Sequence, residues 1–353
     1  MRFASAKDAC ETIESAIAFG INHIETAPAY GTSEQSVGAA IQALAIDRQQ
    51  IVLTTKLLPS VAPNEVEEAI ERSLIRLKTD YIDCLAIHGI NTDQHLHDAE
   101  EKILPALQKV LASGKVRHVG FSTHGPLNLI LRAIATNAFS FVNLHYNFFF
   151  QRNAAAIAQA HQRDMGIFII SPADKAGMLY TPPKRLKELC VPYDPLLLNY
   201  RWLLSDARIT TLSVGPATPD ELTWPLQVAD DVGELSEGEV DAIAQLTHTE
   251  KEALSADLCA QCYRCLPCPE EINIPAVLRL RNMAVAYDMK AYGQYRYNMF
   301  ENAGHWFSGA KGNRCTDCGD CLPRCPQQLD IPHLLRDTHE RLKGKKRRRL
   351  WDD

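Results

Sequence analysis

Short apolar runs alternate with longer amphipathic segments from Asn22 to Gly215. Each run has the length of a β-strand, and the segments between them repeat their apolar positions with helical spacing. The seven runs cover residues 23–26, 51–56, 81–88, 117–122, 140–145, 166–171 and 210–215. Strands and helices that alternate in this way are typical of βα units in a parallel sheet, and the pattern predicts a (β/α)8 barrel with one strand missing. Ser33 and Asn64 are the predicted N-caps of the first two helices between strands.

The missing strand is the first one. The chain opens with an amphipathic run, AKDACETIESAIAFG, which precedes every predicted strand, so that only MRF at residues 1–3 stands in the place of a first strand. Two interpretations remain open at this point. Either the natural start lies upstream, or the chain is a shortened form whose barrel closes imperfectly.

A change of pattern near Leu246 marks a second domain. A cysteine-rich stretch follows, then a helical segment rich in aromatic residues from Pro275 to Phe307, and then a second cysteine-rich stretch. We expect a barrel over residues 1–246, a smaller domain over 247–340 and a basic tail over 341–353. The tail contains KGKKRRR and is interpreted as solvated rather than as a docking site for an acidic partner.

Composition narrows the class of protein. Hydrophobic residues make up 46% of the chain and charged residues 23%, as in soluble globular proteins. The longest apolar stretch, Phe139 to Phe150, is too short and too polar to span a bilayer. The first residues lack a secretory signal, so we expect a cytoplasmic protein whose cysteines serve as metal ligands or catalysts. The net charge of −6 argues against general nucleic-acid binding.

Eight of the eleven cysteines fall into two sets, CAQCYRCLPCP and CTDCGDCLPRCP. The first set contains Cys259, Cys262, Cys265 and Cys268, and the second contains Cys315, Cys318, Cys321 and Cys325. The second set has the C-x2-C-x2-C-x3-C-P spacing of bacterial ferredoxins. The two sets therefore predict two [4Fe–4S] clusters.

The fourth cysteine of each set is expected to serve the opposite cluster. Three cysteines at steps of three let a loop wrap one face of a cube, whereas a fourth that is followed by proline leaves that loop. Cys325 would then join the triplet of the first set, and Cys268 the triplet of the second. Two residues separate Cys265 from Cys268, one fewer than the ferredoxin spacing has between its third and fourth cysteines.

Zinc is the competing interpretation, because four thiolates also suit a structural zinc site. Zinc ribbons usually present two separated C-x2-C pairs, however, and these thiols come in unbroken triplets. The long helical segment between the two sets makes this part of the chain resemble the α-helical ferredoxins of respiratory oxidoreductases. The expected fold class is therefore α/β, a (β/α)8 TIM barrel followed by an all-α ferredoxin-like iron–sulfur domain.

Polar side chains follow the predicted strands at the end where such barrels place their chemistry. Four of them form a chemical group: Glu25, Tyr30, Lys56 and His88. An adjacent lysine cation stabilises a phenolate, so it makes a tyrosine a usable general acid. The carboxylate would hold the lysine in place, and the imidazole would orient or polarise a carbonyl group. This set of residues suits hydride delivery to a carbonyl.

The motifs around these residues resemble the aldo/keto reductase family over roughly residues 1–246. They are GINHIETAPAYGTSEQSVG, VLTTK, CLAIHG, GFS, NLHYN, SPADKAG and SVGPATPDEL. With both cysteine sets, the chain is similar to the subgroup that carries a C-terminal ferredoxin-type domain. In that family the four residues named above form the catalytic tetrad.

The resemblance also implies a nicotinamide cofactor along the barrel mouth, NADP(H) or alternatively NAD(H). The residues that match its binding positions are Ser122 and Asn143 for the nicotinamide amide, and Ser171 and Gly215 for the pyrophosphate. Three features differ from the family's usual pattern. Glu25 stands where the acid is usually Asp, Ile170 stands where a tyrosine commonly stacks on the nicotinamide, and PATPDEL lacks the basic residues that many members place on the 2′-phosphate.

Two functions are compatible with the sequence. The first is an oxidoreductase that moves a hydride between NAD(P)H and a small-molecule carbonyl or alcohol, with Tyr30 as general acid and an electron-transfer protein as a candidate partner. The second is an electron-transfer or redox-sensing iron–sulfur protein whose barrel is an inactive scaffold. Glu25, Ile170 and the missing strand favour the second function, and the tetrad at successive strand ends favours the first.

Overall fold

The computed structural model describes residues 5–344 of the chain. It divides into two compact units: Met1–Ala176 with Asn199–Glu234, and Gly177–Leu198 with Leu235–Asp353. Two sequence predictions, the MRF segment in place of the missing strand and the basic tail from residue 345 onward, lie outside the described residues.

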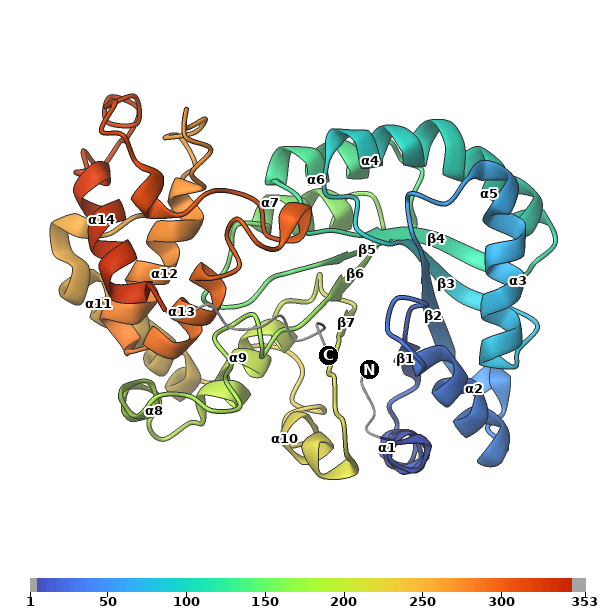
Figure 1. Cartoon of the computed structure of the whole chain (residues 1–353). Coiled ribbons are helices and arrows are strands. Elements are labelled where there is room, and N and C mark those ends of the chain that lie inside the picture. Colours follow the sequence, from blue (N-terminus) through green and yellow to red (C-terminus); the bar gives the residue numbers. More distant parts are fainter. Residues whose placement is uncertain (1–4, 345–353) are drawn as a thin grey trace. The chain divides into compact units, whose positions relative to one another are not determined.

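The first unit is built on one curled sheet of seven parallel strands, in the order β1-β2-β3-β4-β5-β6-β7 (Figure 1). The strands are β1 His23–Glu25, β2 Val52–Leu57, β3 Ile82–Ile87, β4 Val116–Ser122, β5 Phe141–Leu144, β6 Gly166–Ile169 and β7 Thr211–Leu212. All seven predicted strands are confirmed. Within residues 5–344 no strand pairs β7 with β1, so the described sheet is a barrel that is open on one side.

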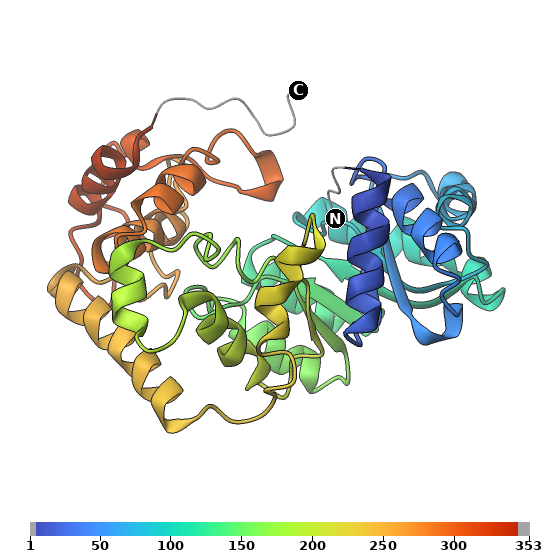
Figure 2. The ribbon, with the colours of Figure 1, turned by 90° about the horizontal axis from the view of Figure 1, so that it is seen from below.

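Helices cover the outer face of the curled sheet (Figures 1 and 2). They are α1 Ala6–Ala18, α2 Ser33–Ala43, α3 Val66–Leu77, α4 Asp93–Asp98, α5 Leu104–Ala112, α6 Leu127–Ala135, α7 Ala154–His161 and α10 Thr223–Leu226. Helices α3, α5 and α7 contact strands β2, β4 and β6, and every residue of β3 is buried. Parallel strands that are covered on both faces read as continuous apolar runs, which is why the sequence revealed them.

The two predicted helix caps are wrong. Thr32, not Ser33, occupies the N-cap position of α2, and the Ser33 hydroxyl instead accepts a hydrogen bond from Thr26 Oγ1 at 2.8 Å. Asn64 lies inside a 3₁₀ turn, Pro63–Glu65, so the N-cap is Glu65 and α3 begins one residue later than expected. Both errors are of one or two residues, because capping side chains recur near helix ends and a short 3₁₀ turn shifts the start.

The second unit is helical. Its helices are α8 Lys184–Cys190, α11 Glu237–Leu254, α12 Ile274–Tyr287, α13 Lys290–Tyr297 and α14 Ile331–Leu342, and α9 Pro195–Leu204 begins in this unit and ends in the first. Helix α11 packs against α8 and α12, and α12 packs against α13 and α14. Buried Tyr287, Tyr297 and Phe300 fill the space between these helices.

Helices α12 and α14 begin in the same way, each a few residues after a cysteine loop. The side chains of Asn273 and Asp330 accept from backbone N–H groups in the first turn of the helix, and an Ile-Pro pair follows each cap. Proline suits the first turn because its missing N–H would have no partner there. The two cysteine loops are thus each anchored to a capped helix of this unit.

Candidate active site and cysteine loops

The predicted tetrad comes together at the C-terminal ends of the first three strands. Glu25 ends β1, Tyr30 lies in the loop after it, Lys56 is in β2 and His88 follows β3. The Lys56 ammonium donates to Glu25 Oε1 at 2.6 Å, to Tyr30 OH at 3.1 Å and to the Thr26 carbonyl at 3.2 Å. An ammonium has three protons, so all three donors of Lys56 have partners.

Glu25 and Lys56 form a buried ion pair, with 15% and 2% of their side chains exposed. Burial favours the neutral form of each group, but it does not prevail here. The charge of Lys56 and its hydrogen bond lower the pKa of Glu25 despite burial, and the charge of Glu25 likewise raises the pKa of Lys56. Both groups are therefore charged at neutral pH.

Tyr30 is the exposed member of the tetrad, and it packs against the buried His88. Tyr30 is 37% exposed, and its ring meets the His88 ring edge to face, with 5.7 Å between centroids. The Tyr30 oxygen already accepts from Lys56, so its own proton is the one that can be donated. Burial, and then the nearby Lys56 cation, lower the pKa of His88 to about 4, so this imidazole is neutral at pH 7.

The second oxygen of the Glu25 carboxylate reaches across the mouth of the curled sheet. Glu25 Oε2 accepts from Asn143 Nδ2 of β5 at 2.9 Å and from Ser213 Oγ, just after β7, at 3.4 Å. Asn143 is fully buried, and its Oδ1 has no hydrogen-bond partner among the described residues. This carbonyl oxygen is an acceptor that is already desolvated and still able to receive a donor.

Two of the four predicted cofactor residues lie beside the tetrad. Ser122 pairs with Asn143 in adjacent strands, and its Oγ accepts from the Gly89 N–H at 3.0 Å, which leaves the hydroxyl proton to donate. Ser171 follows β6 with a φ of +51°, and Gly215 lies exposed after β7 with no heavy atom near the position of an added Cβ. Both are thus placed on loops at the same end of the sheet.

Sequence reasoning missed Ser213 and His124, and it did not pair His124 with His145. Ser213 stands in the predicted strand 210–215, but only the last residue of that run was considered. His145 Nδ1 lies 3.0 Å from the Ile170 carbonyl, which requires that this nitrogen carry the proton. His145 Nε2 then accepts from His124 Nδ1, also at 3.0 Å. His145 directly follows β5 and His124 lies two residues after β4, and these positions are the signal that could have identified the pair.

An apolar layer lies beneath the tetrad, inside the curled sheet. Phe141 and Phe168 stack with 4.9 Å between centroids, next to buried Cys84 and Ala86. His23 packs edge to face on Phe168 and bonds to Thr54, and burial lowers its pKa. This layer keeps water away from the lower side of the Glu25 and Lys56 pair.

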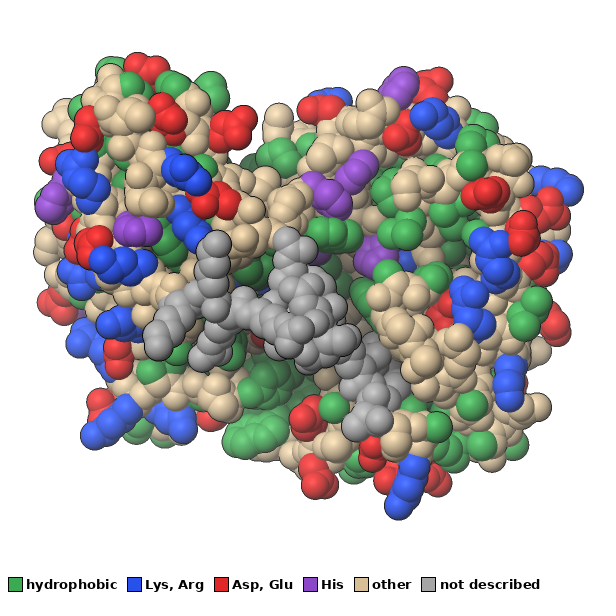
Figure 3. Space-filling model, in the orientation of Figure 1, with side chains coloured by type: hydrophobic (Ala, Val, Ile, Leu, Met, Phe, Trp, Pro, Cys, Tyr) green, Lys and Arg blue, Asp and Glu red, His purple; other side chains and the backbone are tan. Residues whose placement is uncertain are grey.

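On the outer surface shown in Figure 3, acidic and basic side chains are mixed, and neither kind forms a continuous patch.

The fourth cysteine of the first set lines a pocket with the triplet of the second set. One pocket is lined by Cys315, Cys318 and Cys321 of the second set together with Cys268 of the first. Burial raises the pKa of the Cys259 thiol to about 11, and the charges of the nearby Cys262 and Cys325 add to the effect. Cys325 therefore lies near Cys259 of the first triplet, and Cys268 lies beside the second triplet.

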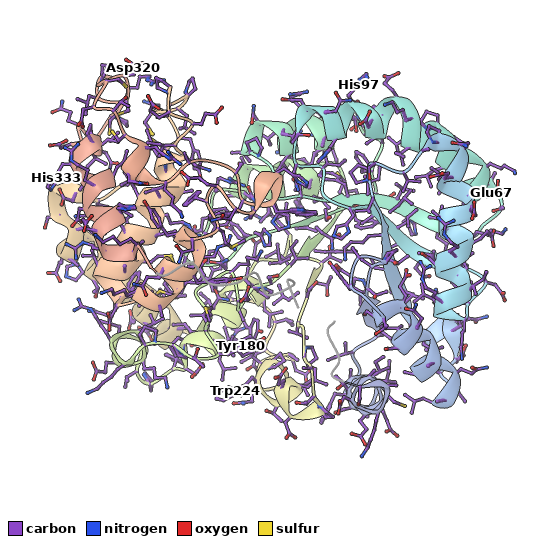
Figure 4. All side chains as sticks on the ribbon, viewed as in Figure 1. Glu67, His97, Tyr180, Trp224, Asp320 and His333 are labelled. Atoms are coloured by element: carbon purple, nitrogen blue, oxygen red, sulfur yellow. The ribbon has the colours of Figure 1, made fainter. Side chains whose placement is uncertain are left out.

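Asp320, between Cys318 and Cys321, lies at the tip of its loop with its side chain directed away from the helices (Figure 4). Within residues 5–344, no three His, Cys, Asp or Glu side chains converge as for a single metal ion. The four cysteines of a [4Fe–4S] cluster each bind a different iron, so they need not share one coordination centre.

Comparison with known proteins defines the family. The sequence model of the aldo/keto reductase family matches residues 2–248, and a 4Fe-4S dicluster domain matches residues 258–329. The chain therefore belongs to the aldo/keto reductase family. It is an oxidoreductase of this NAD(P)H-dependent family with a 4Fe-4S domain at its C-terminal side.

Individual relatives agree with this family. The chain is 24% identical to the uncharacterized oxidoreductase YqkF of Bacillus subtilis over 70% of this chain and 90% of that protein. It is 34% identical to L-galactose dehydrogenase of Arabidopsis thaliana, but over only 33% of this chain and 38% of that protein. An aldo-keto reductase from Klebsiella pneumoniae, solved in complex with NADPH, has the same fold, with a TM-score of 0.57 and 21% identity over 68% of this chain and 85% of that one.

No helix within residues 5–344 is both long enough and apolar enough to cross a membrane.

Proposed function

We propose that this protein transfers a hydride between NAD(P)H and a small-molecule carbonyl or alcohol, with Tyr30 as the general acid. The observation that carries this proposal is the position of Lys56, whose ammonium donates to both the Tyr30 oxygen and the Glu25 carboxylate. A cation on the phenol oxygen stabilises the phenolate that forms when the proton leaves. Glu25 keeps that cation charged and fixed at the point where it is needed.

His88 has a different task in this reaction. Because its pKa is about 4, the neutral ring can donate one N–H to a substrate oxygen without adding a second cation next to Lys56. Its edge-to-face contact with Tyr30 places both donors on one side of the site. A carbonyl oxygen between them would receive the Tyr30 proton while His88 holds its orientation.

The polar groups beside the tetrad fit a nicotinamide. Asn143 Oδ1, buried and without a partner among the described residues, can accept from the carboxamide NH2, and the Ser122 hydroxyl can donate to its carbonyl. Ser171 and Gly215, at the ends of β6 and β7, would hold the pyrophosphate. When bound, NAD(P)H supplies the hydride. The NADPH in the Klebsiella pneumoniae structure supports the phosphorylated cofactor.

We further propose two [4Fe–4S] clusters, each held by a triplet from one loop and one cysteine from the other. The ligands of the first are Cys259, Cys262, Cys265 and Cys325, and those of the second are Cys315, Cys318, Cys321 and Cys268. The shared pocket of Cys268 with the second triplet supports this assignment. Bound clusters supply one-electron transfer.

The two kinds of cofactor would bind to different parts of the chain and exchange different numbers of electrons. A nicotinamide exchanges two electrons as hydride, whereas a [4Fe–4S] cluster exchanges one, so a further electron-transfer protein or a flavin is the expected partner. In this proposal residues 1–246 are the catalytic part, residues 247–340 bind the clusters, and residues 341–353 form a basic tail.

The test uses the full chain, purified without oxygen. NADPH binding is followed by fluorescence and turnover by NADPH absorbance with a panel of small aldehydes and ketones. Tyr30→Phe should keep NADPH affinity and lose turnover by about a hundredfold or more. Tyr81→Phe, which removes a hydroxyl bonded to the Arg48 carbonyl at 3.3 Å, is the matched control and should stay active.

Two outcomes would contradict the proposal. Turnover that survives Tyr30→Phe would remove Tyr30 from the chemistry. Intact clusters without any NADPH binding would instead support the electron-transfer or redox-sensing function with an inactive barrel.

A further inference from the structure

The Glu25 carboxylate is held at both oxygens by side chains from the ends of three other strands. Oε1 binds Lys56, while Oε2 receives Asn143 and Ser213, which are 118 and 188 residues away along the chain. A shorter aspartate at the same backbone position would end one methylene earlier. The added length of Glu25 is therefore what brings its second oxygen to β5 and β7.

The orientation of the Asn143 amide follows from chemistry. An ionised carboxylate can only accept hydrogen bonds, so the NH2 group of Asn143 must face Glu25 Oε2. The amide carbonyl then points away from Glu25, and it is this oxygen that is buried without a partner among the described residues. The Asn143 NH2 group thus donates to Glu25 of the tetrad, and its Oδ1 can accept from another donor.

A glutamate needs such outside contacts to keep a catalytic orientation. Its terminal torsion is broad and roughly two-fold, so nothing in the side chain itself decides which oxygen faces Lys56. Asn143 and Ser213 are neutral donors. They donate hydrogen bonds to Oε2 but carry no charge, so Lys56 stays the ion-pair partner of Glu25. Hydrogen bonds to a charged acceptor are about twice as strong as those between neutral groups.

We propose that Asn143 and Ser213 are positioning residues of the tetrad, which fix Glu25 against Lys56, and that Asn143 also joins this carboxylate to the nicotinamide carboxamide. The inference rests on the function proposed above and adds two residues and one link to it. Neither residue touches the reacting atoms. Both act on Tyr30 through Glu25 and Lys56.

The titratable groups that face Glu25 come from three neighbouring segments. They are His23 of β1 itself, Tyr30 in the loop after β1, Lys56 of β2, and Cys84 and His88 of β3 and its end. From β5 and the end of β7, only the neutral Asn143 and Ser213 bond to the carboxylate among the described residues. A change in the pH profile caused by substituting Asn143 or Ser213 should therefore reflect the titration of Glu25 and of its direct partner Lys56.

Three variants separate the two roles. Ser213→Ala removes only a donor to Glu25. Asn143→Ala removes both the Asn143 NH2 donor to Glu25 and the amide carbonyl proposed to bind the nicotinamide. Asn143→Asp places a second acid against Glu25. The loss of a donor to a carboxylate raises the pKa at which it protonates, so the acid limb of the kcat profile should move to higher pH. We expect a shift of about one pH unit for Asn143→Ala, a smaller one for Ser213→Ala and a larger one for Asn143→Asp.

NADPH affinity gives a readout that does not depend on turnover. Asn143→Ala should weaken NADPH binding about tenfold, and Ser213→Ala should change it by less than about twofold. A second such readout is infrared titration of the Glu25 carboxylate, identified as the band lost in Glu25→Gln. Thermal unfolding confirms that each variant is folded.

The result that overturns the inference is specific. Folded Asn143 and Ser213 variants whose Glu25 titration and NADPH affinity match the unchanged protein would remove both from the positioning role. Failure of the proposed function looks different, because Tyr30→Phe would then keep its turnover or the unchanged protein would not bind NADPH.

Discussion

Lys56 Nζ lies 2.6 Å from Glu25 Oε1, and the two side chains form an ion pair that is almost closed to solvent. Removing two charges from water is costly, and their mutual attraction offsets the cost only when the remaining hydrogen-bonding groups are also satisfied. In this site they are, because Lys56 also donates to Tyr30 and to the Thr26 carbonyl. The pair is therefore stable as a unit and vulnerable to the loss of one member.

The first prediction concerns that vulnerability. Lys56→Met keeps most of the apolar length of the side chain but leaves Glu25 as a buried carboxylate without its cation, which should lower the free energy of unfolding by about 3–5 kcal/mol. Lys56→Met combined with Glu25→Gln removes the unpaired charge and should recover part of that loss. Denaturant unfolding of both variants measures the difference. Equal stability of the single and double variants would show that Glu25 takes up a proton or reaches solvent without cost.

The second prediction follows from His88. Its pKa is about 4 in the folded protein against 6.5 for an ordinary histidine, so the unfolded chain binds a proton more readily in that interval. Stability must then fall as pH decreases from about 6.5 to 4, by about 3 kcal/mol from this group, and must be independent of it above pH 7. His88→Gln should lose that much less stability over the same interval, measured by thermal unfolding at matched pH. Parallel curves for the two proteins would contradict the depressed pKa.

The third prediction tests the exchange of cysteines between loops. Cys268→Ser should lower the iron content from about eight to about four atoms per chain, because it removes a ligand of the second cluster. Cys190→Ser, which changes a buried thiol at the end of α8, is the control and should retain about eight. Iron and sulfide analysis after anaerobic purification gives the count. A full count in Cys268→Ser would mean that another group ligates the second cluster.

The fourth prediction concerns the close approach of helices α2 and α3. A Cβ at Gly38 would lie 2.3 Å from the carbonyl oxygen of Arg76, and backbone cannot move aside as a flexible side chain can. Gly38→Ala should therefore destabilise the protein by about 1–3 kcal/mol. Ala39→Ser changes the exposed neighbour on the same helix and should stay within about 0.5 kcal/mol. Equal melting temperatures for the two variants would show that α3 shifts freely away from α2.

The sequence predicted the strands and the tetrad because both signals are local or periodic. A covered parallel strand such as β3 is apolar at nearly every position, with Asp83 as its exception, and Lys56 or His88 stands out at the end of such a run. The cysteine loops were equally visible because their spacing is fixed by the geometry of a cube. Helix caps were not, since a 3₁₀ turn before α3 moves the start of the helix past Asn64.

The rest depended on contacts between distant parts of the chain. Nothing near Ser213 in the sequence indicates that it faces Glu25, because that contact exists only once the curled sheet brings the end of β7 to the end of β1. Asn143 was predicted as a cofactor residue from its motif, but its bond to Glu25 spans 118 residues and depends on an extra methylene. The packing of Gly177–Leu198 with the second unit is likewise a product of tertiary contacts.

The contact between Glu25 and Ser213 links the ends of the first and last strands, which do not pair with each other among the described residues of the sheet. A motion that separates β1 from β7 would lengthen the hydrogen bond from Ser213 to the carboxylate that holds Lys56 in place. The geometry of the tetrad should consequently respond to the separation of the edge strands. A ligand or substitution that spreads these strands should slow proton transfer from Tyr30 under conditions in which the protein is still folded.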